Sequence, residues 1–250
     1  MTAVSFPHRE PELSRQTVIV IGGSAGIGLA TARRARAEGA DVILTGRSAE
    51  RLQLAARELG ARQIAAFDAN DAARLDQFFR DLSGPIDHVM VTAGRPRYGR
   101  LFDSDPAELG RDLESHLVMM LRVARHAADK VRPGGALVFM GGTGGRRPRA
   151  NLGIVPTETA ALPALVASLA LELAPIRVNL IAAGFVDTPL SADLLGDDLE
   201  RRRKHLRDTL PIGRVVGPAD VAALAVHLMT NTALTGATYD IDGGQQLVDA

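Results

Sequence analysis

The stretch Thr17–Gly28, TVIVIGGSAGIG, decides the fold. It begins with a run of apolar and β-branched residues, which is typical of a strand buried on both faces. A glycine-rich turn follows, and then an amphipathic segment, Gly26–Glu38, that predicts a helix. Glycines at such a turn let the backbone approach a pyrophosphate closely, and the helix N-terminus offers unpaired N–H groups and a positive dipole end. The expected phosphate-binding residues are Gly22, Ser24, Gly26, Ile27 and Gly28.

Short apolar runs alternate with longer amphipathic segments along the rest of the chain. The expected further strands are Asp41–Thr45, Gln63–Phe67, His88–Thr92, Ala136–Met140, Arg177–Ile181 and Ala237–Ile241. The expected further helices are Ala49–Leu59, Asp71–Leu82, Pro106–Lys130, Leu162–Leu173 and Pro218–Met229. Apolar strands separated by helices imply a parallel sheet covered on both faces, and right-handed crossovers make it doubly wound. We therefore predict an α/β fold, a Rossmann-type doubly wound parallel sheet of about seven strands with helices on both faces.

The composition is that of a globular protein without charge bias. Of the 250 residues, 46% are hydrophobic, the formal net charge is +0 and there is no cysteine. Disulfides and cysteine chemistry are therefore excluded, and neither nucleic acid nor a membrane is an expected partner. No apolar run is long enough to span a bilayer, and the N-terminus lacks a signal-peptide pattern. We expect a cytoplasmic protein with a flexible N-terminal extension, residues 1–14, and one Rossmann-fold domain over residues 15–250.

Several further motifs occur in the order and spacing of one known family. They are the glycine turn, which fits TGxxxGxG with Ile21 for threonine, Asp68-Ala69-Asn70-Asp71, Thr92-Ala93-Gly94, Arg177-Val178-Asn179, Ala183–Thr188 and Asp242-Gly243-Gly244. From about Leu13 to Val248, the chain resembles the short-chain dehydrogenase/reductase family. Two motifs depart from the family pattern, because both asparagines of NNAG are replaced (Val91, Thr92) and Ala183 stands for a proline. The resemblance implies a nicotinamide-dependent oxidoreductase.

The residue that follows the second strand bears on the choice of cofactor. An acidic side chain there would accept hydrogen bonds from the ribose diol of NAD, whereas Arg47 pairs well with a 2′-phosphate. We therefore expect NADP(H) to be preferred over NAD(H), the alternative being that Arg47 is a solvated surface residue. The resemblance implies further cofactor contacts at Asp68, Ala69, Ala93, Gly94, Gly184, Val186 and Thr188.

The residues that carry the family's chemistry are absent. The resemblance implies a serine, a Tyr-x-x-x-Lys pair and an asparagine, and these positions correspond to Gly142, Val155, Thr159 and His116. The sequence contains no Tyr-x-x-x-Lys anywhere, because its tyrosines are Tyr98 and Tyr239 and its lysines are Lys130 and Lys204. Valine cannot exchange a proton and threonine carries no charge near neutral pH, so we predict that the standard catalysis is lost. Pro163 further suggests that the helix here starts late, with Thr159 as its cap, or is kinked.

Few side chains are candidates to replace the missing catalytic groups. His116 titrates near neutral pH and is a candidate acid or base, the alternative being a histidine that only packs between helices. Thr143 is a candidate hydroxyl if the loop is shifted by one residue, and Glu158 a candidate if it faces the cleft rather than only the start of its helix. The arginines of residues 146–149 either hold an anionic group or belong to a solvated loop, and the charged run Asp197–Asp208 is either a substrate lid or a plain helix face. No metal site has suitable spacing.

Two functions remain open. The first is a divergent NADP(H)-binding oxidoreductase of unknown substrate, and the second is a non-catalytic cofactor sensor or oligomer partner on the same fold. The segment Leu162–Leu173 is apolar almost all round, so one side is expected to pack on another subunit. The family resemblance implies a homotetramer or homodimer through this helix and the long one before it.

Overall fold

The apolar runs of the sequence form one parallel sheet. The computed structural model describes residues 12–248, and within them the strands are β1 (Thr17–Ile21), β2 (Asp41–Gly46), β3 (Gln63–Ala66), β4 (Ile86–Val91), β5 (Val131–Gly142), β6 (Arg177–Ala183) and β7 (Thr238–Ile241). Their order in the sheet is β3-β2-β1-β4-β5-β6-β7, and all neighbours are parallel. The direction of winding reverses between β1 and β4, which is where doubly wound sheets bind their ligands. The predicted fold class is confirmed.

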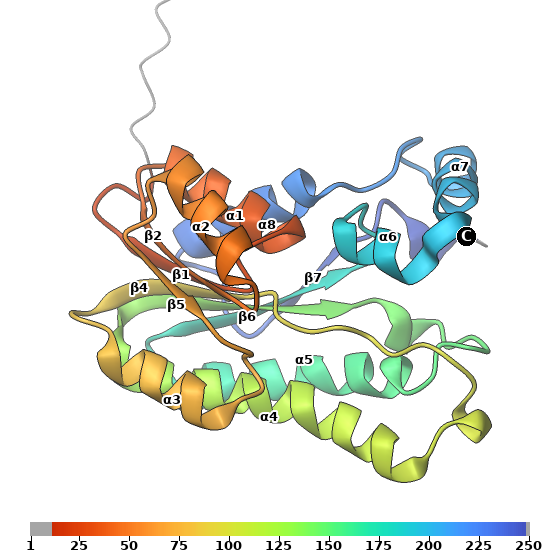
Figure 1. The fold of residues 1–250 in the computed structure, drawn as a ribbon, viewed down its shortest axis with the longest axis horizontal. Coiled ribbons are helices and arrows are strands. Elements are labelled where there is room, and N and C mark those ends of the chain that lie inside the picture. The colour runs from red at the N-terminus through yellow and green to blue at the C-terminus, as the bar shows by residue number, and fades with distance from the viewer. Residues whose placement is uncertain (1–11, 249–250) are drawn as a thin grey trace, which may run out of the picture.

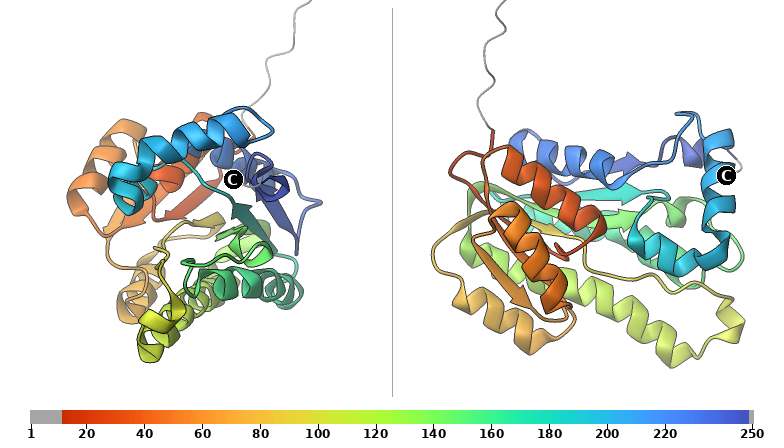
Figure 2. Two further views of the ribbon diagram at one scale, coloured as in Figure 1. Left: turned by 90° about the vertical axis from the view of Figure 1, so that its right-hand side faces the viewer. Right: turned by 45° about the horizontal axis from the view of Figure 1, so that its top comes forward.

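Helices cover both faces of the sheet, as Figure 1 shows. The helices on one face are α1 (Gly26–Ala37), α2 (Ala49–Leu59) and α8 (Pro218–Thr230). Those on the other face are α3 (Ala72–Asp81), α4 (Pro106–Lys130) and α5 (Val155–Glu172). Two further helices, α6 (Pro189–Leu195) and α7 (Leu199–Thr209), follow the carboxyl end of β6 and lie together at one end of the molecule (Figure 2).

Each face of the sheet has its own apolar core. Strand β1 contributes to both, because its side chains alternate: Ile19 and Ile21 pack toward α3, α4 and α5, whereas Val18 and Val20 pack toward α1, α2 and α8. All four side chains are fully buried. This explains why the strand carries only apolar side chains after Thr17.

Helix α5 begins earlier than the sequence suggests. The expected late start with Thr159 as cap is wrong, since α5 starts at Val155 with a proline in its first turn. The Thr159 hydroxyl instead donates back to the Val155 carbonyl oxygen at 2.9 Å, a bond made within the helix. Pro163 lies inside the helix, where it has no N–H to donate to the Thr159 carbonyl oxygen.

Residues 12–14 of the expected N-terminal extension are part of the described structure. Residues 1–11 of the predicted N-terminal extension lie outside the described part, but Leu13 is fully buried among the α1 and β1 side chains. Its N–H donates to the Glu38 carbonyl oxygen at 2.9 Å. In residues 12–248, no helix has the length and apolarity needed to cross a bilayer. The same residues contain no group of three or more His, Asp or Glu side chains arranged to hold a metal ion.

Candidate cofactor and active site

The glycine turn after β1 is closed too tightly to accept side chains. Gly22 has a φ of +96°, and a Cβ on Gly28 would lie 2.2 Å from the Gly22 carbonyl oxygen. The Thr92 hydroxyl, at the end of β4, lies 3.2 Å from the carbonyl oxygens of both Ile21 and Gly22. Thr92 thereby ties β4 to the turn and leaves the N-terminus of α1 facing outward. This is the geometry that binds a phosphate through backbone N–H groups.

A cavity of about 440 Å³ extends from this turn across the carboxyl ends of the strands. Most of the residues expected to contact the cofactor line it. They are Gly22, Ser24, Gly26, Ile27, Gly28, Arg47, Asp68, Ala69, Ala93, Gly94 and Thr188. Gly184 and Val186 do not line it. Gly184 packs against the C-terminal segment, where a Cβ would lie 2.6 Å from Gln245 Oε1, and Val186 is buried beside Val216.

One end of the cavity carries positive charge. Arg47 follows β2 and Arg51 lies one turn along α2, and both exposed side chains line the cavity. The turn after β3 is fixed opposite them, because Asp68 Oδ1 accepts a hydrogen bond of 2.9 Å from the Asn70 N–H. Two guanidinium groups beside a phosphate-binding turn favour a negatively charged phosphate group over the uncharged diol of a ribose.

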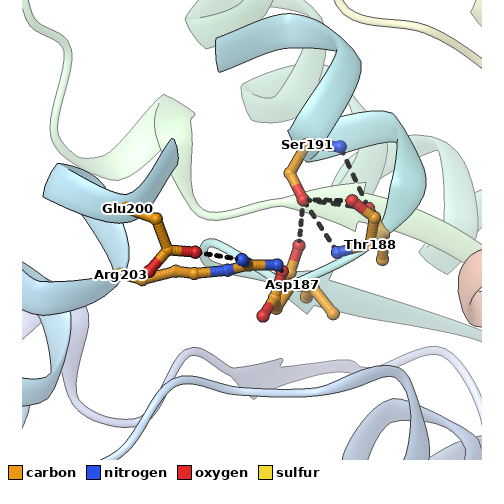
Figure 3. Close-up of polar contacts among 6 residues, drawn as sticks. Asp187, Thr188, Ser191, Glu200 and Arg203 are labelled. Carbon is orange, nitrogen blue, oxygen red and sulfur yellow. Dashed lines mark hydrogen bonds and ion pairs between the residues drawn. The ribbon is translucent and has the colours of Figure 1, made fainter. Parts of the chain in front are cut away.

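The segment after β6 closes the cavity from above the glycine turn. Thr188 caps α6 through a reciprocal pair of hydrogen bonds with Ser191 of 3.1 and 2.8 Å (Figure 3). The adjacent Asp187 accepts a bond of 2.6 Å from Arg203 of α7, and Glu200 also pairs with Arg203. These contacts place Pro189, Leu190 and Asp193 of α6 in the wall of the cavity. Arg203 of the charged run on α7 therefore contacts the segment after β6, and no residue of that run lines the cavity.

The other end of the cavity holds a pair of titratable side chains. His116 of α4 and Glu158 of α5 line it, and His116 Nδ1 lies 3.5 Å from Glu158 Oε1. The imidazole also lies against Gly94, where a Cβ would be 3.1 Å from Nδ1. Asp112, one turn before His116, lines the same wall and pairs with Arg97 Nε at 2.8 Å. The cleft thus contains a histidine and two carboxyl groups from facing helices.

Burial sets the protonation of this pair. Desolvation lowers the pKa of His116 below its usual range, partly offset by the backbone of Met140, which favours the protonated ring. Desolvation, and then the negative charge of Asp112, raise the pKa of Glu158 to about 7. At neutral pH the imidazole is therefore neutral, and Glu158 is close to its midpoint. The pair can take up or release one proton near physiological pH.

Comparison with known proteins identifies the family. Residues 22–246 match the family model described as enoyl-(acyl carrier protein) reductase. The chain belongs to the short-chain dehydrogenase/reductase family. It is 27% identical to the short-chain dehydrogenase/reductase ATR9 of Stachybotrys chlorohalonatus, over 94% of this chain and 98% of that protein.

Two solved structures illustrate the likeness in three dimensions. The MalC reductase/Diels-Alderase of Malbranchea aurantiaca has 25% identity and a TM-score of 0.88, covering 95% of this chain and 99% of that one. BdcA in complex with NADPH has 27% identity and a TM-score of 0.83, covering 93% and 95%. The chain is thus an oxidoreductase of the short-chain dehydrogenase/reductase family, whose members bind NAD(P)(H).

Gly142, Val155 and Thr159, which the sequence predicts to replace the family's serine, tyrosine and lysine, come together, but not at the larger cavity. A Cβ on Gly142 would lie 3.4 Å from Thr159 Cγ2, and a Cβ on Gly144 would lie 3.8 Å from Val155 Cγ1. Neither Val155 nor Thr159 lines the larger cavity, whereas their neighbours Ile154 and Glu158 do. Gly142 and Thr159 instead line a second cavity of about 190 Å³. Only small or apolar groups occupy the positions where this family places its proton donor.

Two other predictions from the sequence are not supported as parts of the site. Thr143 is only 9% exposed and lines neither cavity, because its backbone N–H is bonded to the Ala183 carbonyl oxygen at the end of the sheet. Two of the loop arginines contact the C-terminal segment, and Arg146 also lines the second cavity. Arg146 pairs with Asp240, and Arg147 donates to the Gln246 carbonyl oxygen at 3.0 Å.

Sequence reasoning missed several cavity residues. They are Arg51, Asn70, Arg95, Arg97, Asp112, Ser115, Met119, Met140, Ile154, Pro189, Leu190 and Asp193. One signal was available, since Asp112 lies one helical turn before His116 and shares its face of α4. The loop residues Arg95 and Arg97 have no such signal, because their positions depend on how the loop folds over α4.

Proposed function

We propose that this chain is an NADP(H)-dependent oxidoreductase that works without the serine, tyrosine and lysine of its family. One observation carries the proposal: a single cavity connects the phosphate-binding turn and Arg47 with His116 and Glu158. When bound, the cofactor supplies the hydride, so the protein has only to position a substrate and manage charge. The NADPH-bound relative supports this choice of cofactor.

The residues present would divide the work along the cavity. The glycine turn and the N-terminus of α1 would bind the pyrophosphate, and Arg47 would pair with the 2′-phosphate. Asp68 would meet the adenine, and Gly94 would lie against the nicotinamide half. His116 is then the candidate acid or base, since it is the one imidazole in the cavity wall and lies within 3.5 Å of Glu158.

A non-catalytic sensor or oligomer partner is the alternative function. It is favoured by the apolar or small residues at Gly142, Val155 and Thr159, which offer no proton donor. General acid catalysis is worth about 10²–10⁴-fold, so ordinary ketones should be reduced only at trace rate. The presence of His116 and Glu158 in the cavity favours an enzyme over this alternative.

The test combines binding and turnover. Calorimetry with NADPH and NADH should give tighter binding of NADPH, and NADPH consumption should be followed with ketones, aldehydes, quinones and imines. We expect activity on at least one class other than simple ketones, and His116→Ala should abolish it. Robust turnover that survives His116→Ala would exclude His116 from the chemistry. Cofactor binding without turnover on any class would favour the non-catalytic alternative.

A further inference from the structure

Two carboxyl groups line the reacting end of the cavity. Asp112 and Glu158 line it from α4 and α5, with side chains that are 27% and 16% exposed. The cation nearest to Asp112 is Arg97, which is shared with Glu108 at 2.6 Å. Arg97 is thus divided between two carboxylates, and the exposed Arg95 is a further cation that lines the same cavity.

Glu158 has no cationic partner of its own. Among residues 12–248, the only basic group within 4.0 Å of its carboxylate is His116, and burial keeps that imidazole neutral. The family's lysine would have lain next to it, at Thr159, on the following position of the helix. A partly buried carboxylate without a counter-ion is unfavourable, and it becomes favourable when a ligand brings a positive charge.

The missing groups and the two carboxyl groups fit one kind of hydride acceptor. A neutral carbonyl becomes an alkoxide and needs a proton, which the family's tyrosine and lysine would have supplied. An iminium carbon needs none. It accepts the hydride of NADPH, the π electrons of the carbon–nitrogen bond become the nitrogen lone pair, and the positive charge passes to the oxidised nicotinamide. The site therefore contains one positive charge throughout the reaction, first on the iminium and then on the nicotinamide.

We infer that the substrate class of this site is a cationic carbon–nitrogen double bond, held against Glu158 and Asp112 and reduced by NADPH to an amine. The inference rests on the proposed function as an NADP(H)-dependent oxidoreductase. Glu158 acts here as the counter-ion of the substrate and not as a proton donor. His116 lies 3.5 Å from the Glu158 carboxyl group, and it would serve as acid or base only for substrates that need a proton.

The pH dependence distinguishes a counter-ion from an acid. The groups that face Glu158 are His116 and Asp112 from α4 and Tyr98 from the loop after β4. Burial and then Glu158 raise the pKa of Tyr98, so it stays neutral, and His116 is neutral as well. Because the pKa of Glu158 is about 7, the carboxylate forms as the pH rises through that value. Reduction of a permanent cation should then increase with pH, whereas acid-assisted reduction of a ketone should decrease.

The experiment uses the full-length protein with NADPH and a panel of N-methylated cyclic iminium salts of increasing ring size, each matched by the ketone of the same ring. Steady-state rates are measured from about one pH unit below to one above the midpoint of Glu158. We expect reduction of at least one iminium salt with a rate that rises with pH, and only trace reduction of its ketone. Glu158→Gln should lower kcat/KM for the iminium about tenfold and flatten the pH profile.

The matched control is Glu114→Gln, which removes an exposed carboxylate of α4 that does not line the cavity. It should leave the rate and the pH profile unchanged. Calorimetry shows whether Glu158→Gln still binds NADPH, and Asp112→Asn gives a second variant with the same expected direction if the first is unstable.

The outcomes separate the two proposals. If the unmutated protein does not bind NADPH, the proposed function fails and the inference with it. If NADPH binds but none of the iminium salts is reduced, the substrate class is wrong while the cofactor site stands. A ketone reduced faster than its iminium, with a rate that falls as the pH rises, would make Glu158 a proton donor and overturn the inference. An iminium rate that is equal in Glu158→Gln and Glu114→Gln would also overturn it.

Discussion

At the residue scale, the predicted loss of the family's chemistry rests on three positions. Gly142, Val155 and Thr159 stand where the resemblance implies the serine, tyrosine and lysine, and they carry none of those reactive groups. In contrast, the glycines that the phosphate turn requires are all kept, and at Gly28 a Cβ would collide with the Gly22 carbonyl oxygen at 2.2 Å. Binding geometry and proton chemistry therefore depend on different residues, and one can be lost without the other.

Arg47 provides a test of the cofactor preference at this scale. Arg47→Ala should weaken NADPH binding about tenfold or more and leave NADH binding nearly unchanged, because a charge-assisted pairing with the 2′-phosphate is worth roughly 1.5–3 kcal/mol. Calorimetry with both cofactors measures the effect. Arg57→Ala, an exposed arginine of α2 outside the cavity, is the control and should change neither affinity. Equal affinity of the unmutated protein for NADPH and NADH would contradict the prediction.

At the scale of elements, α5 and α4 build the reacting end of the cavity. Glu158 of α5 and the preceding N-cap residue Ile154 line the larger cavity, while Val155 and Thr159 face the loop after β5. Because α5 starts at Val155, the two family positions lie one turn apart on a formed helix. The internal proline does not disturb this turn, since it follows Thr159 by a full turn of helix.

The placement of Val155 and Thr159 outside the larger cavity predicts that the family's residues would not act there. The variant Gly142→Ser/Val155→Tyr/Thr159→Lys should reduce ketones at a rate close to that of the unmutated protein, well short of the roughly 10²–10⁴-fold that general acid catalysis contributes, because the tyrosine hydroxyl would not enter the cavity. A serine fits at position 142, where a Cβ would have only ordinary contacts. The rate is measured as NADPH consumption.

The control replaces Val155 with phenylalanine in the same triple variant, which keeps the ring and removes the hydroxyl. It should show no gain over the unmutated protein. If the tyrosine variant gains ketone activity that the phenylalanine control lacks, the tyrosine does reach the reacting end of the cavity, and the placement of Val155 outside it is incorrect.

At the scale of the whole molecule, α5 leaves an apolar face uncovered. Ala164, Ala167 and Ser168 are exposed on it, and Leu171 is 82% exposed. The opposite face packs on the sheet through Leu162, which is fully buried. An exposed, nearly uncharged helix face of small residues is typical of a subunit interface.

We therefore predict a homodimer or homotetramer formed through α5 and α4. Leu171→Glu should shift the protein toward monomers in light scattering at micromolar concentration, because the interface would bury an unpaired carboxylate. Leu54→Glu changes a leucine of α2 that is 58% exposed on the other side of the sheet, and it should leave the assembly intact. A monomeric unmutated protein at this concentration would contradict the prediction.

The sequence by itself determined the fold and the cofactor end of the site. The apolar strand, the glycine turn and the helix after it form one continuous segment, and local sequence fixes their structure because glycine alone fits the turn. The alternation of strands and helices then leaves a doubly wound parallel sheet as the natural arrangement. The absence of a Tyr-x-x-x-Lys motif also follows from the sequence alone, because every tyrosine and lysine in it can be located.

Only the tertiary structure decided what occupies the reacting end. His116 and Glu158 are far apart in the sequence, and their meeting depends on how α4 packs beside α5. The raised pKa of Glu158 comes from burial and from Asp112, and neither cause is visible in a list of residues. Thr143, Arg146 and Arg147 were candidates because of their place in the chain, but Thr143 is buried outside the larger cavity and the two arginines contact the C-terminal segment. Local patterns fix backbone conformation, whereas the contacts that tune a site are made between elements distant in sequence.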